Sequence, residues 1–175
     1  AVFRRVRSRV CSWGDSFLLA VAKKVNPEKL IAITVSSQFV PKREIESAKS
    51  IALSIGVEHI CLDVDILENE DVARNTTQRC YYCKKQLFSL IRQTAENLGI
   101  ATLLHAVNLD DLKDFRPGLK ASEELGFLSP LADAEFTKSD IRRLSKELDL
   151  ETWDKPSQSC LATRIPYNIK IKPEP

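Results

Sequence analysis

Short apolar segments rich in β-branched residues alternate along this chain with segments of helical periodicity. Residues 30–35 and 57–64 are typical of buried strands, and residues 44–55 between them carry an apolar face at helical spacing, ended by a glycine at position 56. The alternation continues with a helix expected over 82–98, a strand over 101–107, and a helix that a capping box opens at 137 and that runs to about 148. Repeated strand–helix units predict an α/β fold with a doubly wound parallel sheet, whose ligands lie beyond the carboxyl ends of the strands.

The composition is that of a globular protein, with 43% hydrophobic and 29% charged residues. No apolar run approaches the roughly 20 residues that span a bilayer, and the first residues lack a secretory signal, so we expect a cytoplasmic protein without membrane contact. The net charge of +2 argues against nucleic acid as a partner, and the arginines of the first ten residues are interpreted as a solvated face. Five cysteines cannot all pair, and a C-x-x-C pair in a cytosolic chain is more often a metal or redox site than a disulfide.

A candidate phosphate-binding turn precedes an apolar helix start, and its residues are Ser12, Trp13, Gly14, Asp15 and Ser16. The free amides and the dipole of a helix N-terminus bind phosphate. The segment resembles the PP-loop, S-G-G-x-D-S, with which a superfamily of ATP pyrophosphatases binds the pyrophosphate of ATP. One glycine of that motif is absent and Trp13 is bulky, so the backbone approaches phosphates less easily. Either the loop has degenerated or the sequence is altered at this point, and the intact remainder of the pattern favours an alteration.

Three cysteines stand in settings that suit chemistry. Cys80 and Cys83 lie three positions apart at a predicted helix start, where the helix dipole and the flanking cations favour the thiolate. Cys160 lies in residues 152–167, a stretch too polar and too rich in proline for a core element, whose Trp, Asp, Lys and Arg residues suit a binding loop. Cys61 belongs to an apolar strand, and we expect it to be a small buried core residue.

These motifs resemble those of the ATP-dependent sacrificial sulfur transferases of the LarE type, which act in building the nickel-pincer nucleotide cofactor of lactate racemase. The resemblance covers nearly the whole chain, and it is carried by RCYYCK at 79–84, NLDD at 108–111, DFRPG at 114–118, SPL at 129–131, TK and IR within 137–142, and the block from TWDKP to tyrosine at 152–167. It implies that ATP activates a carboxylate of a pyridinium mononucleotide as the acyl-adenylate, and that sulfur is then delivered to that carbon. Some members surrender the sulfur of one cysteine, at the position of Cys160. Other members hold an iron–sulfur cluster with three cysteines, at the positions of Cys80, Cys83 and Cys160. By this resemblance the chain is of the three-cysteine kind.

The resemblance also implies the remaining site residues. ATP with magnesium is expected to bind at Ser12, Gly14, Asp15 and Ser16, with residues 34–37, among them Thr34 and Ser36, near the adenine. Asp15 assists magnesium and pyrophosphate, and it is a candidate catalytic residue together with Cys160. Asn108 and Asp110 follow a strand and are expected to face the same cleft. Lys155 and Arg164 are candidate anchors for a substrate phosphate or carboxylate, with a polar surface loop as the alternative for both.

Several alternatives stay open. Three thiolates on a [4Fe–4S] cluster leave one iron open for an extra sulfide. Zinc is the alternative metal and needs a fourth ligand such as His105, Cys11 or Cys61, and free thiols are the third possibility. The rival functions are a tRNA thiolase of the same superfamily and a nucleotide- or metal-binding module without catalysis.

The chain is divided into an ATP pyrophosphatase domain, residues 1–150, and a cysteine-containing segment, residues 151–175. That segment is interpreted as the start of a C-terminal portion that members of the family continue beyond this chain. We expect the full-length protein to be a homo-oligomer.

Overall fold

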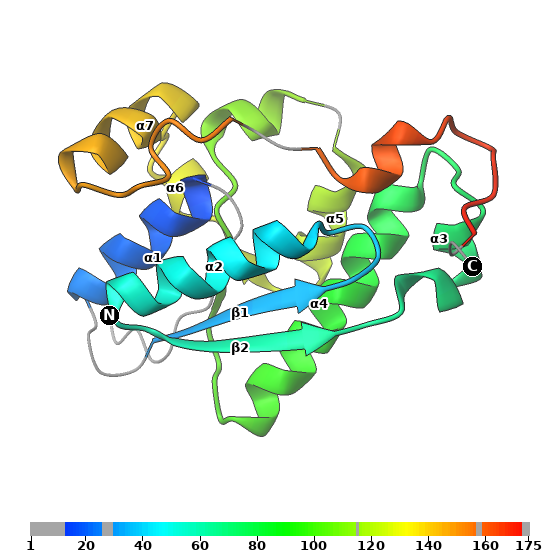
Figure 1. The fold of residues 1–175 in the computed structure, drawn as a ribbon, viewed down its shortest axis with the longest axis horizontal. Helices are drawn as coiled ribbons and strands as arrows, with labels where there is room; N and C mark the ends of the chain where they lie inside the picture. The colour runs from blue at the N-terminus through cyan, green and yellow to red at the C-terminus, as the bar shows by residue number, and fades with distance from the viewer. Residues whose placement is uncertain (1–12, 26–29, 115, 157–158, 173–175) are drawn as a thin grey trace.

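The computed structural model describes residues 13–25, 30–114, 116–156 and 159–172. Its first half alternates helix and strand in the order α1 (Trp13–Val25), β1 (Ile31–Ser36), α2 (Lys42–Ile55) and β2 (Glu58–Asp63). The two strands pair in parallel, from Ile31 opposite Glu58 to Ser36 opposite Asp63, and α2 makes the crossover between them (Figure 1). The predicted α/β fold with parallel strands is therefore confirmed in this half of the chain.

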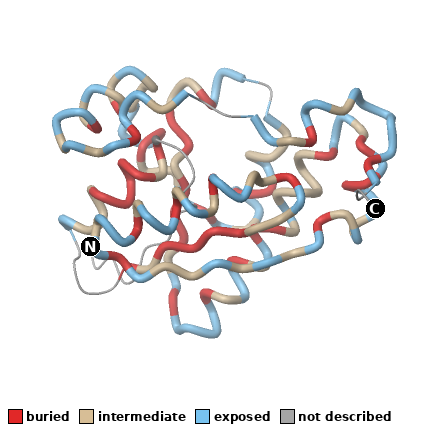
Figure 2. The backbone as a smooth tube through the Cα atoms, in the orientation of Figure 1, coloured by how far each residue is buried: buried red, intermediate tan, exposed pale blue. Residues whose placement is uncertain are grey.

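Strand β1 lies at the centre of the core because its side chains alternate between two hydrophobic clusters. Ala32 packs with residues of α1 and α2, whereas Ile33 and Val35 pack with residues of α4 (Arg79–Asn97). Helices therefore cover both faces of β1, as a doubly wound sheet requires. Figure 2 shows buried residues running along β1 and along the inner side of α1.

The second half is built from shorter elements around the long helix α4. They are η1 (Ile66–Glu68), α3 (Glu70–Ala73), α4, β3 (Leu103–Leu104), η2 (Leu109–Lys113), α5 (Pro117–Glu124), β4 (Phe127–Leu128), α6 (Pro130–Asp133), α7 (Lys138–Glu147) and η3 (Leu161–Arg164). Strands β3 and β4 pair in parallel, and the His105 amide extends this ladder by donating to the Leu128 carbonyl at 3.1 Å. Within the described residues, the strands thus form two parallel pairs.

The helix ends follow the local chemistry of the sequence. Gly56 ends α2 in the left-handed conformation, with φ 71°, which glycine adopts without a Cβ clash. The predicted capping box opens α7: the Thr137 side chain accepts from the Asp140 amide, and the Asp140 carboxylate accepts from the Thr137 amide.

Two expectations about strands were wrong. The strand expected over residues 101–107 is limited to Leu103–Leu104, because the chain turns into the capped helix η2 directly after Val107. Cys61 is exposed on β2 and is not a core residue. One edge of β2 pairs with β1, and among the described residues no strand pairs with the other edge of β2.

The segment after α7 returns across the molecule to α3 and α4, as the orange and red trace in Figure 1 shows. Backbone hydrogen bonds attach it to the loop after β1 and to α3, from the Leu161 amide to the Phe39 carbonyl at 3.2 Å and from the Ile171 amide to the Ala73 carbonyl at 2.8 Å. Ala162 and Ile171 are buried in the cluster that contains α4. The segment that carries Cys160 therefore packs on the same core as β1 and α4.

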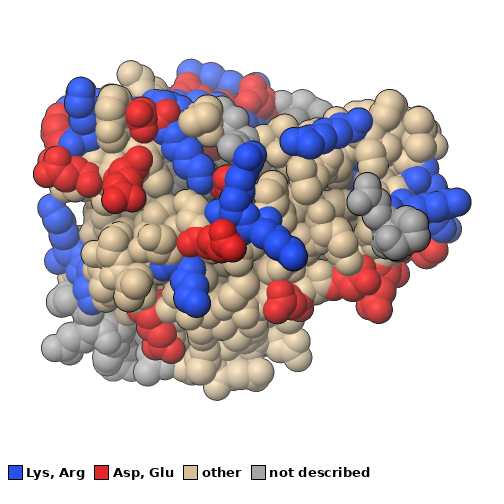
Figure 3. Space-filling model, in the orientation of Figure 1, with Lys and Arg blue, Asp and Glu red and all other residues tan. Residues whose placement is uncertain are grey.

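In the part of the chain that the structure describes, no helix is both long and apolar enough to cross a membrane. Basic and acidic side chains are interspersed over the face drawn in Figure 3.

Candidate active site

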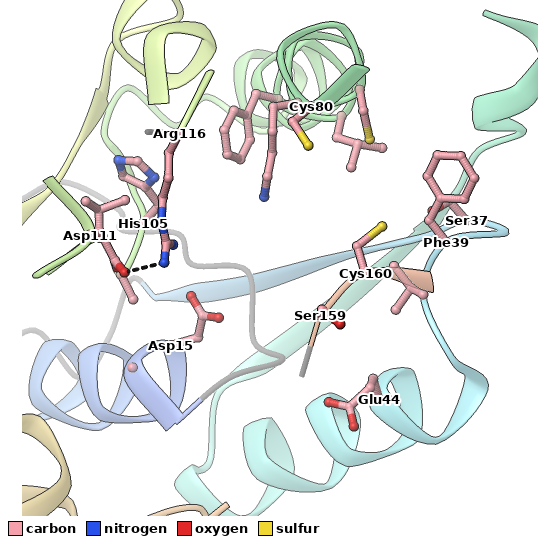
Figure 4. Close-up of a pocket in the computed structure, with 18 of the residues that line it drawn as sticks. Asp15, Ser37, Phe39, Glu44, Cys80, His105, Asp111, Arg116, Ser159 and Cys160 are labelled. Carbon is pink, nitrogen blue, oxygen red and sulfur yellow. Dashed lines mark ion pairs between the residues drawn. The ribbon is translucent and has the colours of Figure 1, made fainter. Parts of the chain in front are cut away.

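One cavity of about 500 Å³ is lined by side chains that lie far apart in the sequence. Five segments contribute most of its lining, namely the first turn of α1, the loop after β1, the start of α4, the loop from His105 to Asp111, and the segment from Lys155 to Cys160. Glu44, Arg116 and Lys138 complete it. Figure 4 shows side chains from these segments pointing into one space. The cavity lies where β1 ends, which is where a doubly wound sheet binds its ligands.

The phosphate-loop residues meet this cavity at the N-terminus of α1. Gly14 and Asp15 line it, and the Asp15 carboxylate points into it (Figure 4). Ser16 is fully buried and does not line the cavity. Ser12 lies outside the described residues. The first turn of α1 therefore brings one predicted carboxylate and one glycine to the site.

The residues near the end of β1 divide between core and cavity. Thr34 is fully buried, and its hydroxyl bonds the ring of His59 at 2.9 Å. Ser36 is half-buried, and neither Thr34 nor Ser36 lines the cavity. Ser37 does line it, and its hydroxyl oxygen is buried without a hydrogen-bond partner among the described residues. A buried polar atom of this kind is stabilised when a ligand supplies the missing partner.

The three cysteines lie on the walls of the same cavity. Cys80 and Cys83 come from the first turn of α4, and Cys160 is the residue that precedes η3. None of the three forms a disulfide with another described residue, and Cys80 and Cys83 are half-buried while Cys160 is exposed. Figure 4 shows the Cys80 and Cys160 sulfurs on opposite sides of the cavity, facing its interior. Tertiary structure thus brings together thiols that are far apart in sequence.

The donor set suits an iron–sulfur cluster, since three thiols open onto a cavity with room for a large group. The described residues contain no group of three or more His, Cys, Asp and Glu side chains placed to hold a metal ion. Among the described residues, the thiols therefore share a cavity without forming a ready-made metal site. Of the fourth ligands considered for zinc, Cys61 lies away from the cavity and Cys11 lies outside the described residues.

A buried carboxylate organises the loop after β3. Asp111 accepts from the Asn108 side-chain amide at 2.7 Å and pairs with Arg116 at 3.0 Å and Lys138 at 3.5 Å. Asn108 is 2% exposed, and its side-chain oxygen accepts from the amides of Asp110 and Asp111. The Asn108 side chain therefore shapes the loop, and three of its hydrogen bonds are internal.

Two cations on this wall were not singled out from the sequence. Arg116 and Lys138 line the cavity, and each keeps more than 40% of its side chain exposed while it is held by Asp111. Cations placed in this way can approach phosphate oxygens. Asp110 does not line the cavity; its carboxylate accepts from the Lys138 amide at 2.8 Å and so helps to cap α7.

The His105 imidazole is a neutral member of the cavity wall. Burial, followed by the charge of Lys84, lowers the pKa of His105 from 6.5 to about 4. Its Nε2 atom lies 2.6 Å from the Ser129 hydroxyl, and the ring contacts Phe88 and Phe127 edge-on. The imidazole therefore remains uncharged at neutral pH and can take part in hydrogen bonding without adding charge.

The two predicted substrate anchors have different surroundings. Lys155 lines the cavity, but its ammonium group lies 2.8 Å from the buried Glu44 carboxylate of α2. Arg164 is exposed and does not line the cavity. Charge partners such as Glu44 are not visible in a sequence, because the contact joins residues that are far apart along the chain.

Comparison with solved structures identifies the fold. The chain is similar to NMN synthetase from Francisella tularensis, with a TM-score of 0.69 and 14% identity, over 89% of this chain and 66% of that one. It is also similar to the U34-tRNA thiolase NcsA from Methanococcus maripaludis, solved with its [4Fe–4S] cluster, with a TM-score of 0.67 and 16% identity, over 93% of this chain and 63% of that one. The fold is that of the PP-loop ATP pyrophosphatases, as predicted.

Relatives identified by sequence identity show more than the fold. The chain is 34% identical over 144 residues to the pyridinium-3,5-bisthiocarboxylic acid mononucleotide synthase of Lactiplantibacillus plantarum, covering 82% of this chain and 52% of that protein. It is 38% identical over 161 residues to an uncharacterized protein of Synechocystis sp., covering 91% of this chain and 60% of that protein. The chain thus spans less than two thirds of the length of these curated relatives. It is a homologue of this synthase, which confirms the resemblance to the LarE type seen in its motifs. No family model matches the chain.

Proposed function

We propose that this protein is an ATP-dependent sulfurtransferase that adenylates a carboxylate of a pyridinium mononucleotide and transfers sulfur to it. The observation that carries the proposal is the single cavity lined by Gly14 and Asp15, by three cysteines and by the cations Arg116 and Lys138. The 34% identity to a pyridinium-3,5-bisthiocarboxylic acid mononucleotide synthase supports this substrate class.

In the first step, a substrate carboxylate oxygen attacks the α-phosphorus of ATP, and pyrophosphate leaves. The N-terminus of α1, where Gly14 lies, offers backbone amides and the positive end of the helix dipole to the phosphates. Asp15 would hold a magnesium ion, which when bound offsets phosphate charge, and Arg116 and Lys138 offset the charge that develops on the leaving pyrophosphate. The buried Ser37 hydroxyl bonds the nucleotide near the end of β1.

In the second step, sulfide attacks the activated acyl carbon, the bond from that carbon to the AMP oxygen breaks, and a thiocarboxylate forms. Cys80, Cys83 and Cys160 would hold the [4Fe–4S] cluster, which when bound supplies an iron site open to an extra sulfide. These thiols lie on the same cavity as Asp15, so the activated carbon need not leave the site between the steps. The neutral His105 adds no positive charge that would compete for the sulfide.

An ATP–pyrophosphate exchange assay tests the adenylation step. We expect exchange that depends on a pyridinium mononucleotide carrying a carboxylate, and we expect Asp15→Asn to lower it at least about tenfold, as loss of a group that stabilises transition-state charge does. Asp63→Asn is the matched control, since Asp63 is exposed on β2 and outside the cavity. Exchange that occurs only with tRNA would favour the thiolase. ATP binding without exchange on any acceptor would identify a binding module.

A further inference from the structure

Asn75 joins the turn between α3 and α4 to the segment that follows Cys160. It is fully buried, and its φ of 57° is left-handed, a conformation that asparagine tolerates better than most residues. Its side-chain amide donates to the Pro166 carbonyl at 2.8 Å and to the Ile169 carbonyl at 3.0 Å. Its own carbonyl accepts from the Asn168 amide at 2.9 Å. One residue therefore holds the backbone of the returning segment at three points.

Arg79 completes the connection from the first residue of α4. It is 3% exposed, and its Nη1 atom donates to the Asn75 side-chain oxygen and, at 3.0 Å, to the Ala162 carbonyl. Its guanidinium lies over the Tyr167 ring, 5.3 Å from the centroid. Among the described residues no carboxylate forms an ion pair with Arg79, so this buried cation is held by carbonyl, amide and ring contacts. Burying an always-charged group in this way is costly, which points to a positional role.

The contacts of Arg79 link the backbones beside two of the thiols. Arg79 directly precedes Cys80, and the Ala162 carbonyl that it binds lies two residues after Cys160. Apolar burial alone does not hold this segment, because residues 163–170 are exposed or half-buried. Hydrogen bonds to Asn75 and Arg79 therefore add to the backbone bonds at Leu161 and Ile171 in fixing where the Cys160 segment lies relative to the start of α4.

We propose that Asn75 and Arg79 are positioning residues, which hold the Cys160 segment against the start of α4 so that Cys160 faces Cys80 across the cavity. The functional meaning of this inference rests on the proposed function, in which these thiols act together. The geometric claim is independent of turnover and can be tested without ATP, metal or substrate.

The test is thiol cross-linking of the metal-free protein with dibromobimane, with the linked peptides identified by mass spectrometry. The readout is the ratio of the Cys80–Cys160 link to the Cys80–Cys83 link. The second link lies within the first turn of α4 and serves as an internal reference. Asn75→Gly removes the side chain while glycine keeps the left-handed backbone, and Arg79→Gln removes the charge and the fork of donors. We expect each variant to lower the ratio roughly tenfold. Loss of a charge-assisted hydrogen bond changes the equilibrium between the closed and the locally opened segment by about this factor.

Arg92→Gln is the matched control. Arg92 is also on α4 and also donates to a backbone carbonyl, that of Leu125, but it lies outside the cavity. Its replacement should leave the ratio unchanged even where it lowers the melting temperature. Arg79→Lys retains the charge and should restore the ratio in part.

An unchanged ratio in folded Asn75→Gly and Arg79→Gln overturns the proposal. If either variant does not fold, the milder Arg79→Lys decides, and a wild-type ratio in it also counts against the proposal. A normal ratio in the wild-type protein together with no sulfur transfer would instead refute the proposed function and leave the positioning role intact.

Discussion

Replacing Glu44 by Gln removes the charge that holds Lys155. The replacement tests whether Lys155 holds the Cys160 segment in place or binds the substrate. The Glu44 side chain is 9% exposed and the Lys155 side chain 21%, with 2.8 Å between carboxylate oxygen and ammonium nitrogen. Lys155 also lies 3.4 Å from the Ser47 hydroxyl, and the Arg142 guanidinium donates to its carbonyl at 2.9 Å. The ion pair therefore attaches the segment leading to Cys160 to the first turns of α2.

The expected effect follows from burial. Removing one partner of a buried pair leaves an uncompensated charge and costs about 3–5 kcal/mol when burial is complete. Because Lys155 keeps some access to water, we expect Glu44→Gln to lower the free energy of unfolding by about 2–3 kcal/mol. For a chain of this length that lowers the melting temperature by about 4–12 °C. The double variant with Lys155→Met should lose less than the sum of the single variants, because neither charge is then left alone.

Urea unfolding of the wild type, both single variants and the double variant gives the coupling energy directly. The matched control is the pair Arg143–Glu147, which has the same 2.8 Å separation but side chains that are 61% and 58% exposed. Glu147→Gln should change the free energy of unfolding by no more than about 0.5 kcal/mol.

Additive losses in the Glu44 and Lys155 variants, within about 0.5 kcal/mol, would refute the reasoning. In that case a Lys155→Met enzyme with unchanged stability and a raised KM for the nucleotide substrate would support the substrate-anchor role predicted from the sequence. Loss of stability with little change in KM would assign Lys155 to holding the Cys160 segment.

Three further predictions concern the cavity. Folding lowers the pKa of His105 from 6.5 to about 4, so the unfolded chain binds a proton at a higher pH than the folded chain does. The free energy of unfolding should therefore decrease as pH falls through this interval, by about 3 kcal/mol at pH 4. His105→Gln should flatten that part of the pH profile measured by urea unfolding. An equally steep profile in the variant would assign the loss to other groups. Intact mass after many turnovers should be unchanged if Cys160 is a ligand, whereas a loss of about 34 Da, equivalent to H₂S leaving a thiol, would show that it gives up its own sulfur. Cys80→Ala should remove bound iron and sulfur transfer but retain ATP–pyrophosphate exchange, since adenylation uses no thiol. Iron analysis, the sulfur-transfer assay and the exchange assay check this, and full iron content in the variant would refute the ligand role.

Much of the scaffold is encoded locally and could be predicted from the sequence. Strand β1, the end of α2 at Gly56 and the start of α7 at Thr137 follow from apolar periodicity, from a left-handed glycine and from a capping box. Each of these depends on residues within one or two turns of each other, so single-sequence reasoning finds them. The chemistry of the site was also visible, because cysteines and a phosphate-loop motif are informative residue types at any position.

Tertiary structure alone decided how those residues are used. Asn108 and Lys155 were candidate ligand contacts, and the fold engages them with Asp111 and Glu44. Cys61 was expected in the core, and its edge strand leaves it exposed. Nothing in the sequence indicated the hydrogen bonds by which Asn75 and Arg79 hold the Cys160 segment, although Arg79 belongs to the RCYYCK block. These features depend on contacts between residues far apart along the chain, and only the packing of α4, β1 and the returning segment brings the partners within hydrogen-bonding distance.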